Sequence, residues 1–381
     1  MPDGSAVSIF AVGDVFPDMP DGRAAFAALE PLLGTADIVF GNCEGVYSDA
    51  PEPAPTHKHF MCAPLERGSM LGAVGFDVMT LANNHMIDGG YAGLRHTSEL
   101  LQSQGIAVTG AGANLAEATR PAIVERHGQR IGFLGFCTVH PVGYEARPSR
   151  PGLSSLRVRT HYADPDPNFL EPGIDPVIST LPDPGDLERC RKVIAEAREQ
   201  VDFLVVAHHW GYSSWMEVIQ DYELELARDA VEHGADAVVC HHTHSLRGID
   251  VYQGKPIFYG LGALMHHFSD HKPSTQAMAE RLALWGDIAS MAPGEDLPLW
   301  PFRTDTQMTG IATLDVAADG AVKAGLIPAI MLADGSTEPL GRDDPRATQI
   351  ADYLERITKR VGFETTYVRD ERDGFMLVRV D

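Results

Sequence analysis

Side chains that bind metals stand at the ends of five short apolar runs in this sequence. Carboxylate residues end the first two runs, an amide pair and a histidine end the third, and histidines end the last two. The polar residues at these positions are Asp14, Asn42, Glu44, Asn83, Asn84, His85, His208, His209, His241, His242 and His244. Carboxylate, amide and imidazole groups together suit a divalent ion such as Mn, Fe, Zn or Ca.

Each of these groups alone has an ordinary structural explanation. A lone aspartate after a strand is commonly a helix N-cap, and paired asparagines can form a turn. A buried histidine is more often hydrogen-bonded in a core than bound to a metal. The joint pattern is harder to explain in this way, because five independent run ends carry it. We therefore predict a site for one or two divalent ions per chain, with no organic cofactor.

Strands and helices must bring these residues to one edge. The short apolar runs predict buried strands, and stretches with helical periodicity separate several of them. The helical stretches are residues 21–33, 93–104, 187–200, 222–233 and 344–361. Their alternation predicts an α/β fold with a largely buried sheet, in which ligands gather outside the carboxyl ends of the strands. No repeat or linker divides the 381 residues, so we expect a single domain, 1–381.

Two long segments interrupt this alternation. Residues 147–185 are crowded with Pro, Asp and Ser, and residues 266–305 are rich in Pro, Met and Trp. Both are too long for ordinary connections. We interpret them as two insertions that wall a pocket, and surface embellishment is the alternative.

Composition argues against several partners. The chain has 30 Lys and Arg against 53 Asp and Glu, a formal charge of −23. Nucleic acid and anionic membrane surfaces both require a basic patch, so neither is expected as a partner. The five cysteines are odd in number, and no signal peptide or long apolar run is visible. These features predict a cytoplasmic protein without a disulfide framework or a membrane span.

The chain resembles the CapA family of bacterial capsule and poly-γ-glutamate synthesis proteins in six motifs. They are AVGDVF, GNCEG, LANNHMIDGG, IGFLGF, VVAHHWG and DAVVCHHTHSLRGIDVYQGKPIFYGLG, spread over residues 7–265. That family is itself similar to calcineurin-like metallophosphatases. The resemblance therefore implies a four-layer α/β/β/α sandwich with the metal site at the sheet edge.

The resemblance also implies a role for each candidate residue. The implied metal ligands are Asp14, Glu44, Asn84, His209, His242 and His244. Glu44 takes the place of the aspartate that bridges two metals, and His85 matches the acid/base histidine. The sequence departs from the pattern at Phe16, where metallophosphatases have a histidine. One ion would then keep only three of these ligands, and we expect weaker occupancy there.

Three activities compete. Phosphoester hydrolysis is inferred from similarity of fold alone. The missing histidine also weakens it, because the two-metal mechanism needs both ions to hold the attacking and leaving oxygens. A role in making a glutamate polymer goes, in the family, with exported and membrane-anchored proteins. CapA-like proteins also resemble an epimerase that converts one residue of a ribosomally made lasso peptide to the D form. We favour this last activity: a metal-dependent peptide epimerase that deprotonates and reprotonates Cα. A structural metal site in a non-enzymatic scaffold is a fourth alternative.

Epimerisation needs two bases on opposite faces of Cα. The candidates for these bases are His85, His208, Asp88 and His140. Candidates for peptide binding are Trp210 and Trp215 as an apolar wall, and Lys58 and Arg247 as partners of a substrate carboxylate. The alternative for the two tryptophans is packing on the core, and the alternative for the two cations is ordinary surface charge. The sequence leaves the metal, the exact peptide and the oligomeric state open.

Overall fold

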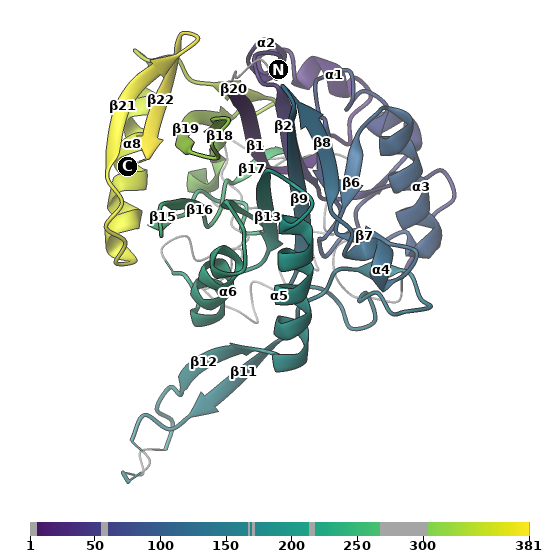
Figure 1. Ribbon diagram of the computed structural model, residues 1–381, viewed down its shortest axis with the longest axis vertical. Helices are drawn as coiled ribbons and strands as arrows, with labels where there is room; N and C mark the ends of the chain where they lie inside the picture. Colours follow the sequence, from purple (N-terminus) through teal and green to yellow (C-terminus); the bar gives the residue numbers. More distant parts are fainter. Residues whose placement is uncertain are drawn as a thin grey trace.

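The computed structural model describes residues 6–54, 60–166, 168–169, 172–212, 218–266 and 304–380. Two large β-sheets lie face to face, and helices pack on their outer faces (Figure 1). The predicted α/β class is thereby confirmed. All five cysteines lie in the described residues, and no disulfide joins any two of them.

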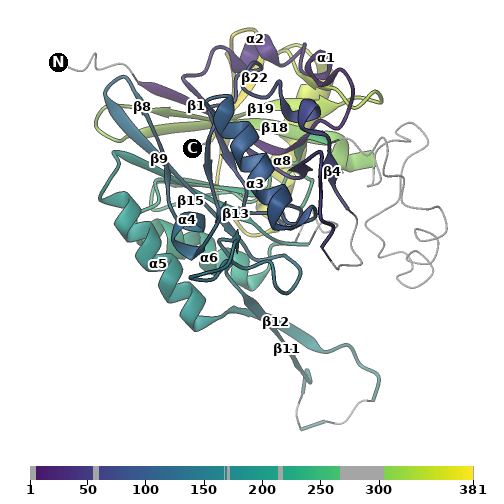
Figure 2. The same ribbon diagram turned by 90° about the vertical axis from the view of Figure 1, so that its right-hand side faces the viewer.

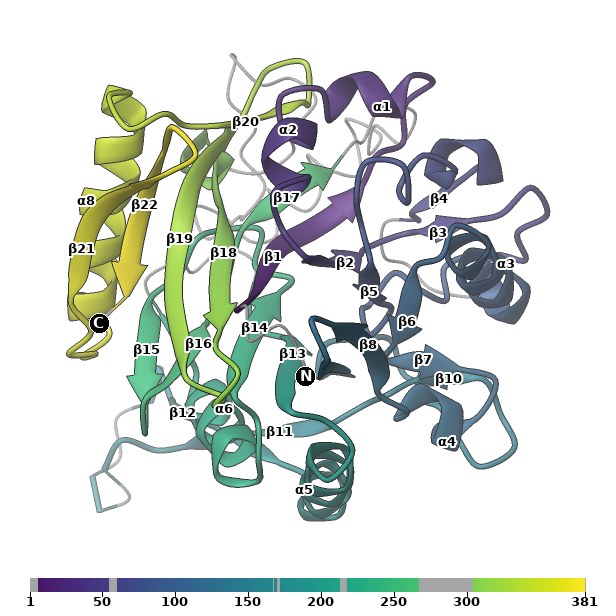
Figure 3. The same cartoon turned by 45° about the horizontal axis from the view of Figure 1, so that its top comes forward.

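The larger sheet has ten strands, and its central part is parallel. Its main path runs in the order β21 (Tyr367–Arg372), β22 (Phe375–Val380), β19 (Val322–Met331), β18 (Met308–Val316), β1 (Val7–Phe16), β2 (Ile38–Cys43), β5 (Val78–Thr80) and β6 (Ala107–Thr109). Two further strands join it, β17 (Ala263–His266) beside β1 and β20 (Thr337–Pro339) beside β19. Figure 3 shows the C-terminal strands at one end of this sheet.

The smaller sheet has six strands and a parallel centre. Its order is β15 (Ile249–Tyr252), β16 (Lys255–Phe258), β14 (Ala237–His241), β13 (Phe203–His209), β9 (Gln129–Cys137) and β8 (Ala122–Arg126). Short two-stranded pairs complete the strands: β3 (Val46–Tyr47) with β4 (Cys62–Ala63), β7 (Ala111–Gly112) with β10 (Gly152–Leu153), and β11 (Val158–Ala163) with β12 (Val177–Pro182).

The inner faces of the two sheets share one apolar core. Phe40 of β2 stacks on Phe133 of β9, with ring centroids 5.0 Å apart, and both rings are fully buried. Alternate residues of β1 and β13 point into the same layer, as the two-residue period of a strand requires. This packing fixes the sheets against each other, so the carboxyl ends of their parallel strands can meet.

Most of the helices cover the outer faces of the two sheets. The α-helices are α1 (Gly22–Ala25), α2 (Glu30–Leu33), α3 (Gly90–Ser103), α4 (Leu115–Ala118), α5 (Pro184–Arg198), α6 (Asp221–Glu232) and α8 (Pro345–Arg360), with 3₁₀ turns at Leu65–Gly68 and Thr304–Gln307. Helices α1–α3 pack on the outer face of the larger sheet and α5 and α6 on that of the smaller one, whereas α8 packs into the core between the sheets. The single helix expected over residues 21–33 is wrong, because the chain forms two short helices there. Pro31 lies in the first turn of the second, where its missing N–H is tolerated.

The first expected insertion contains a projecting hairpin. Strands β11 and β12 extend away from the body of the molecule (Figures 1 and 2). Tyr162 and Ile178 on this hairpin are 69% and 54% exposed. Its base contacts α6, where the Tyr222 amide donates to Thr180 Oγ1 at 3.3 Å. Apart from its ends, the second expected insertion, residues 266–305, lies outside the described residues.

Across the described residues, no helix combines the length and the apolar character needed to cross a membrane.

Candidate metal centre

Asp14 lies in β1 at a point where the strand is irregular. The pairing of β1 with both β2 and β17 shifts next to this residue. A Cβ atom on Gly13 would lie 1.9 Å from the carbonyl oxygen of Gly262, so only glycine fits there. The Asp14 amide donates to the same carbonyl at 3.2 Å. This close approach of two backbones positions the Asp14 carboxylate at the edge where the sheets meet.

One group of possible metal ligands combines Asp14, Glu44 and His244, whose ligand atoms lie within 4.8 Å of one another. His244 Nδ1 is 3.1 Å from Asp14 Oδ2 and 3.6 Å from Glu44 Oε2. Both carboxylates are fully buried. Burying two negative charges is costly unless cations compensate them, so this donor set fits a divalent ion.

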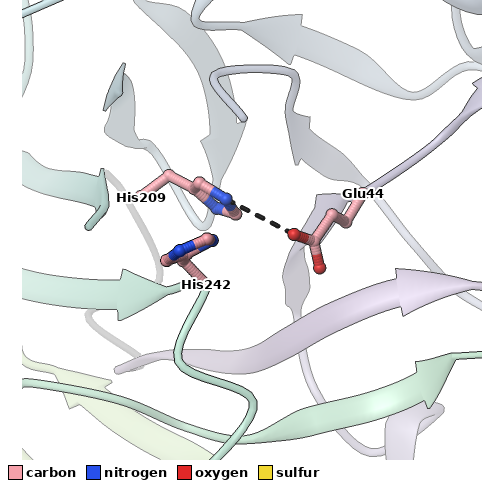
Figure 4. A group of neighbouring side chains, drawn as sticks. All are labelled: Glu44, His209 and His242. Carbon is pink, nitrogen blue, oxygen red and sulfur yellow. Dashed lines mark ion pairs between the residues drawn. The ribbon is translucent and has the colours of Figure 1, made fainter. Parts of the chain in front are cut away.

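A second group combines Glu44, His209 and His242, whose side chains converge from the ends of three different strands (Figure 4). His209 Nε2 lies 3.4 Å from Glu44 Oε1 and 2.7 Å from Asn84 Oδ1. The rings of His209 and His242 are 4.7 Å apart. Nitrogen and oxygen donors in this arrangement fit a Zn-, Mn- or Fe-type ion.

Glu44 belongs to both groups. One of its oxygens faces His209 and the other faces His244. The structure therefore brings together all six ligands expected from the sequence, which are Asp14, Glu44, Asn84, His209, His242 and His244. A carboxylate shared in this way is the arrangement that can bridge two ions.

The loop after β14 holds two of these ligands in an uncommon backbone conformation. His242 has φ 87° and His244 has φ 50°, in the left-handed region that non-glycine residues seldom occupy. The backbone N–H of His242 donates to Asp14 Oδ2 at 3.1 Å. Such strain is concentrated at functional sites, where surrounding contacts hold it in place.

A buried amide network fixes the carboxylates. Asn42 Nδ2 donates to Asp14 Oδ1 at 2.7 Å. Asn83 Nδ2 donates to Asn42 Oδ1 at 3.0 Å and to the Cys43 carbonyl at 2.7 Å. Hydrogen bonds of this kind orient metal ligands and tune their affinity. The two asparagines thus support the ligands rather than adding to them.

Electrostatics match an ion-binding site. Burial alone raises the pKa of Asp14, but the hydrogen bond and charge of His244 outweigh it and hold this pKa well below the usual range. Burial lowers the pKa of His209, and the neighbouring His242 lowers it further. Asp14 is therefore charged and His209 is neutral at pH 7, the forms in which each binds a metal.

His85 and Asp88 form a hydrogen-bonded pair beside Asn84. His85 Nδ1 lies 2.7 Å from Asp88 Oδ2. Asp88 is fully buried and also accepts from the Met61 amide at 2.9 Å and the Tyr144 hydroxyl at 3.3 Å. An ionised carboxylate only accepts, so Nδ1 of His85 donates to Asp88, and Nε2 is the ring nitrogen that can take up a proton. Asp88, expected as a possible base, instead positions His85.

The structure does not bring His208 into this site. Successive side chains of a strand face opposite sides, so His208 points away from the ligands when His209 points towards them. Its ring is fully buried and stacks on Trp210 at 4.6 Å and on Phe136 at 5.7 Å. Burial lowers the pKa of His208 to about 3. It cannot serve as the expected second base.

Two of the expected peptide-binding residues belong to the core. Trp210 is fully buried and stacks on Tyr259 as well as on His208, so it offers no wall to a substrate. Arg247 is 1% exposed, and its Nη1 lies 2.5 Å from Glu223 Oε1. That carboxylate already pairs with the guanidinium, so Arg247 is not available to a substrate.

His140 is the last of the expected bases. His140 follows β9, is half-buried, and its Nε2 lies 2.6 Å from Ser155 Oγ. Lys58 and Trp215 lie outside the described residues.

Sequence reasoning missed His266, whose Nε2 is 3.4 Å from Glu44 Oε2. His266 ends the apolar run of β17, the same signal that identifies the other ligands, but the predicted insertion over residues 266–305 begins at this residue.

Comparison of the sequence with known families matches the bacterial capsule synthesis protein family PGA_cap. The family's sequence profile matches residues 8–267, and the chain belongs to this family.

Individual relatives extend the comparison. The uncharacterized protein y4sH of Sinorhizobium fredii is 31% identical over 305 residues, covering 67% of this chain and 65% of that protein. The PGA biosynthesis protein CapA of Bacillus subtilis is 30% identical over 240 residues, covering 62% and 55%. A probable 5'-nucleotidase of Treponema pallidum is 27% identical over 184 residues, covering 47% and 24%. The chain thus covers less than two thirds of the length of each of these relatives.

Proposed function

We propose that the protein is a metal-dependent hydrolase of the metallophosphatase type that acts on phosphoesters. The observation that carries this proposal is Glu44, whose two oxygens face two separate ligand groups. The face-to-face sheets with ligands at their shared edge fit the sandwich implied by the sequence motifs. The resemblance to a probable 5'-nucleotidase also supports a phosphoester as the bond that is cleaved.

The residues of the site would have three different roles in hydrolysis. The ligand groups around Glu44 would hold two ions, which supply Lewis acidity that stabilises negative charge on a reacting oxygen. His85 Nε2 would transfer the proton to or from the reacting group, because Asp88 holds Nδ1. The amides of Asn42 and Asn83 keep the carboxylates in place. The proposed hydrolysis does not require His208, which faces away from the ligands.

The peptide epimerase expected from the sequence is less well supported. Among the relatives with a functional name, two CapA proteins are named for polymer or capsule biosynthesis and one protein is named as a probable 5'-nucleotidase, which favours the alternatives to epimerisation. Of the proposed bases, His208 and Asp88 are buried and engaged elsewhere. An accessory role in making a glutamate polymer is a second candidate function, favoured by the family and by the names of the CapA relatives. Hydrolysis could serve within such a role.

Activity of reconstituted protein tests the proposal. Metal-stripped protein is loaded with Mn, Zn, Fe or Ca and assayed on bis(p-nitrophenyl) phosphate. We expect cleavage only with metal, and a loss of about 10²- to 10⁴-fold in His85→Ala with metal content unchanged. His161→Ala, which removes an exposed histidine of β11, is the matched control. Fully loaded protein that cleaves no phosphoester but incorporates deuterium into a peptide Cα from deuterium oxide would overturn the proposal.

A further inference from the structure

His266 lies where the first ligand group is incomplete. It is the last residue of β17, which runs parallel to β1, and the two strands pair Phe16 with His266. Phe16 is the position at which the sequence lacks the expected histidine. His266 is 2% exposed, and its ring centroid lies 5.1 Å from that of His244. A histidine on the neighbouring strand thus stands beside the residue that cannot bind a metal.

The distances around Glu44 Oε2 are those of ligands that share an ion. An ion with bonds of about 2.1 Å in tetrahedral geometry separates its ligand atoms by about 3.4 Å. His266 Nε2 is 3.4 Å from Glu44 Oε2, and His244 Nδ1 is 3.6 Å from it. A direct hydrogen bond would be shorter, with an N–H···O distance of about 2.9 Å.

We propose that His266 is the fourth protein ligand of the ion held by Asp14, Glu44 and His244. Both ions would then have two nitrogen and two oxygen ligands, since Asn84 completes the group of Glu44, His209 and His242. Phe16 led us to expect weak occupancy of the first metal position. With His266 as a ligand, both metal positions have comparable ligand sets, which suit Zn, Mn or Fe. The inference rests on the metal binding in the proposed function and does not depend on hydrolysis.

Metal binding measured by equilibrium dialysis with Zn tests the inference. Wild-type protein should bind two ions, and His266→Ala should bind one tightly and the second at least about tenfold more weakly. His208→Ala is the matched control, because it removes an equally buried histidine at the same edge that faces away from the ligands. Adding Phe16→His to His266→Ala should restore the second ion by returning a nitrogen ligand from the paired position of β1.

Cobalt absorption separates a ligand from a residue that only orients Glu44. Loss of a directly bound nitrogen should change the visible spectrum of the Co-loaded protein, and Phe16→His should reverse that change. The inference is overturned if His266→Ala binds two ions with unchanged affinity, or if its cobalt spectrum equals that of the wild type. Wild-type protein that binds no ion at all would instead defeat the metal-binding part of the proposed function. Circular dichroism of each metal-free variant confirms that the fold is retained.

Discussion

At the scale of single residues, Glu44 connects the two ligand groups. It is fully buried, and its oxygens face histidines from both sheets. No other ligand is common to both groups in the described part of the chain. The two possible ions therefore depend on one carboxylate, whereas each histidine serves only one of them.

Substitution of Glu44 should show this asymmetry. We expect Glu44→Gln to weaken both ions by more than about 100-fold, because the neutral amide removes the shared charge and one oxygen ligand. His242→Ala should weaken one ion and leave the other in place. Elemental analysis after gel filtration measures the number of ions retained. Equal losses in the two variants would show that Glu44 is not shared.

Burial of His208 should make the free energy of unfolding depend on pH in mildly acidic solution. Burial lowers its pKa to about 3 from an ordinary value of 6.5. Above pH 6.5 the ring is neutral in both the folded and unfolded chain. Between pH 6.5 and 3 only the unfolded chain takes up the proton, so the free energy of unfolding falls by about 1.4 kcal/mol per pH unit.

The variant His208→Phe should remove this pH dependence and keep an aromatic ring stacked between Trp210 and Phe136. Its free energy of unfolding should fall about 2 kcal/mol less than that of the wild type between pH 6.5 and pH 5. Urea unfolding in the presence of a chelator measures the difference without a contribution from bound metal. Parallel pH profiles for the two proteins would contradict the assignment of a neutral buried imidazole.

The adjacent pair His208 and His209 shows what residue-level pattern could and could not provide. Both follow the same apolar run, and sequence reasoning used both in one site. The two-residue period of a strand already implies that only one of them can face the ligands. Which one does so depends on how the smaller sheet packs against the larger, and that packing is not encoded locally. Trp210 and Arg247 were misassigned for the same reason, since burial is a tertiary property.

At the scale of elements, the helices could be predicted from the sequence, whereas the neighbours of each strand in the sheets could not. Helices α3, α5, α6 and α8 lie close to the stretches expected from periodicity. The position of β17 beside β1 was not predictable, because these strands are far apart in the sequence. The same pairing brings His266 to the site, so the missed ligand follows from a missed strand neighbour.

The loop after β14 is joined to α6 by a buried ion pair. Arg247 and Glu223 are 1% and 0% exposed, and Arg247 also donates to the Val218 carbonyl. Removing one partner leaves the other charge buried and uncompensated. We expect Arg247→Met to lower the free energy of unfolding by about 3–5 kcal/mol, and the double variant with Glu223→Leu to recover most of that loss.

An exposed pair provides the control for this prediction. Arg95 and Glu99 on α3 are 3.2 Å apart, but their side chains are 61% and 59% exposed. Arg95→Met should lower the free energy of unfolding by no more than about 1 kcal/mol. Urea unfolding of the four proteins measures both effects. A stable Arg247→Met variant with a raised KM would restore the abandoned role of Arg247 in substrate binding.

At the scale of the whole molecule, the candidate metal centre joins the two sheets. Asp14, Glu44 and His266 come from the larger sheet or the residue directly after one of its strands, and His209 and His242 come from the corresponding end of the smaller one. The sheets otherwise contact each other through the apolar core between them. Without cations, the buried carboxylates Asp14 and Glu44 would repel each other at this junction.

Metal should therefore stabilise the junction as well as the site. At a free ion concentration 100 times Kd, each bound ion adds about 2.7 kcal/mol to the free energy of unfolding. Chelation should lower the melting temperature by several degrees, and hydrogen exchange should speed up at the carboxyl ends of both β1 and β13. Differential scanning calorimetry and amide exchange with and without Zn measure these effects, and Glu44→Gln should show neither. If exchange changes in only one sheet while two ions are bound, the ions do not bridge the sheets and the ligand groups drawn from both of them are wrong.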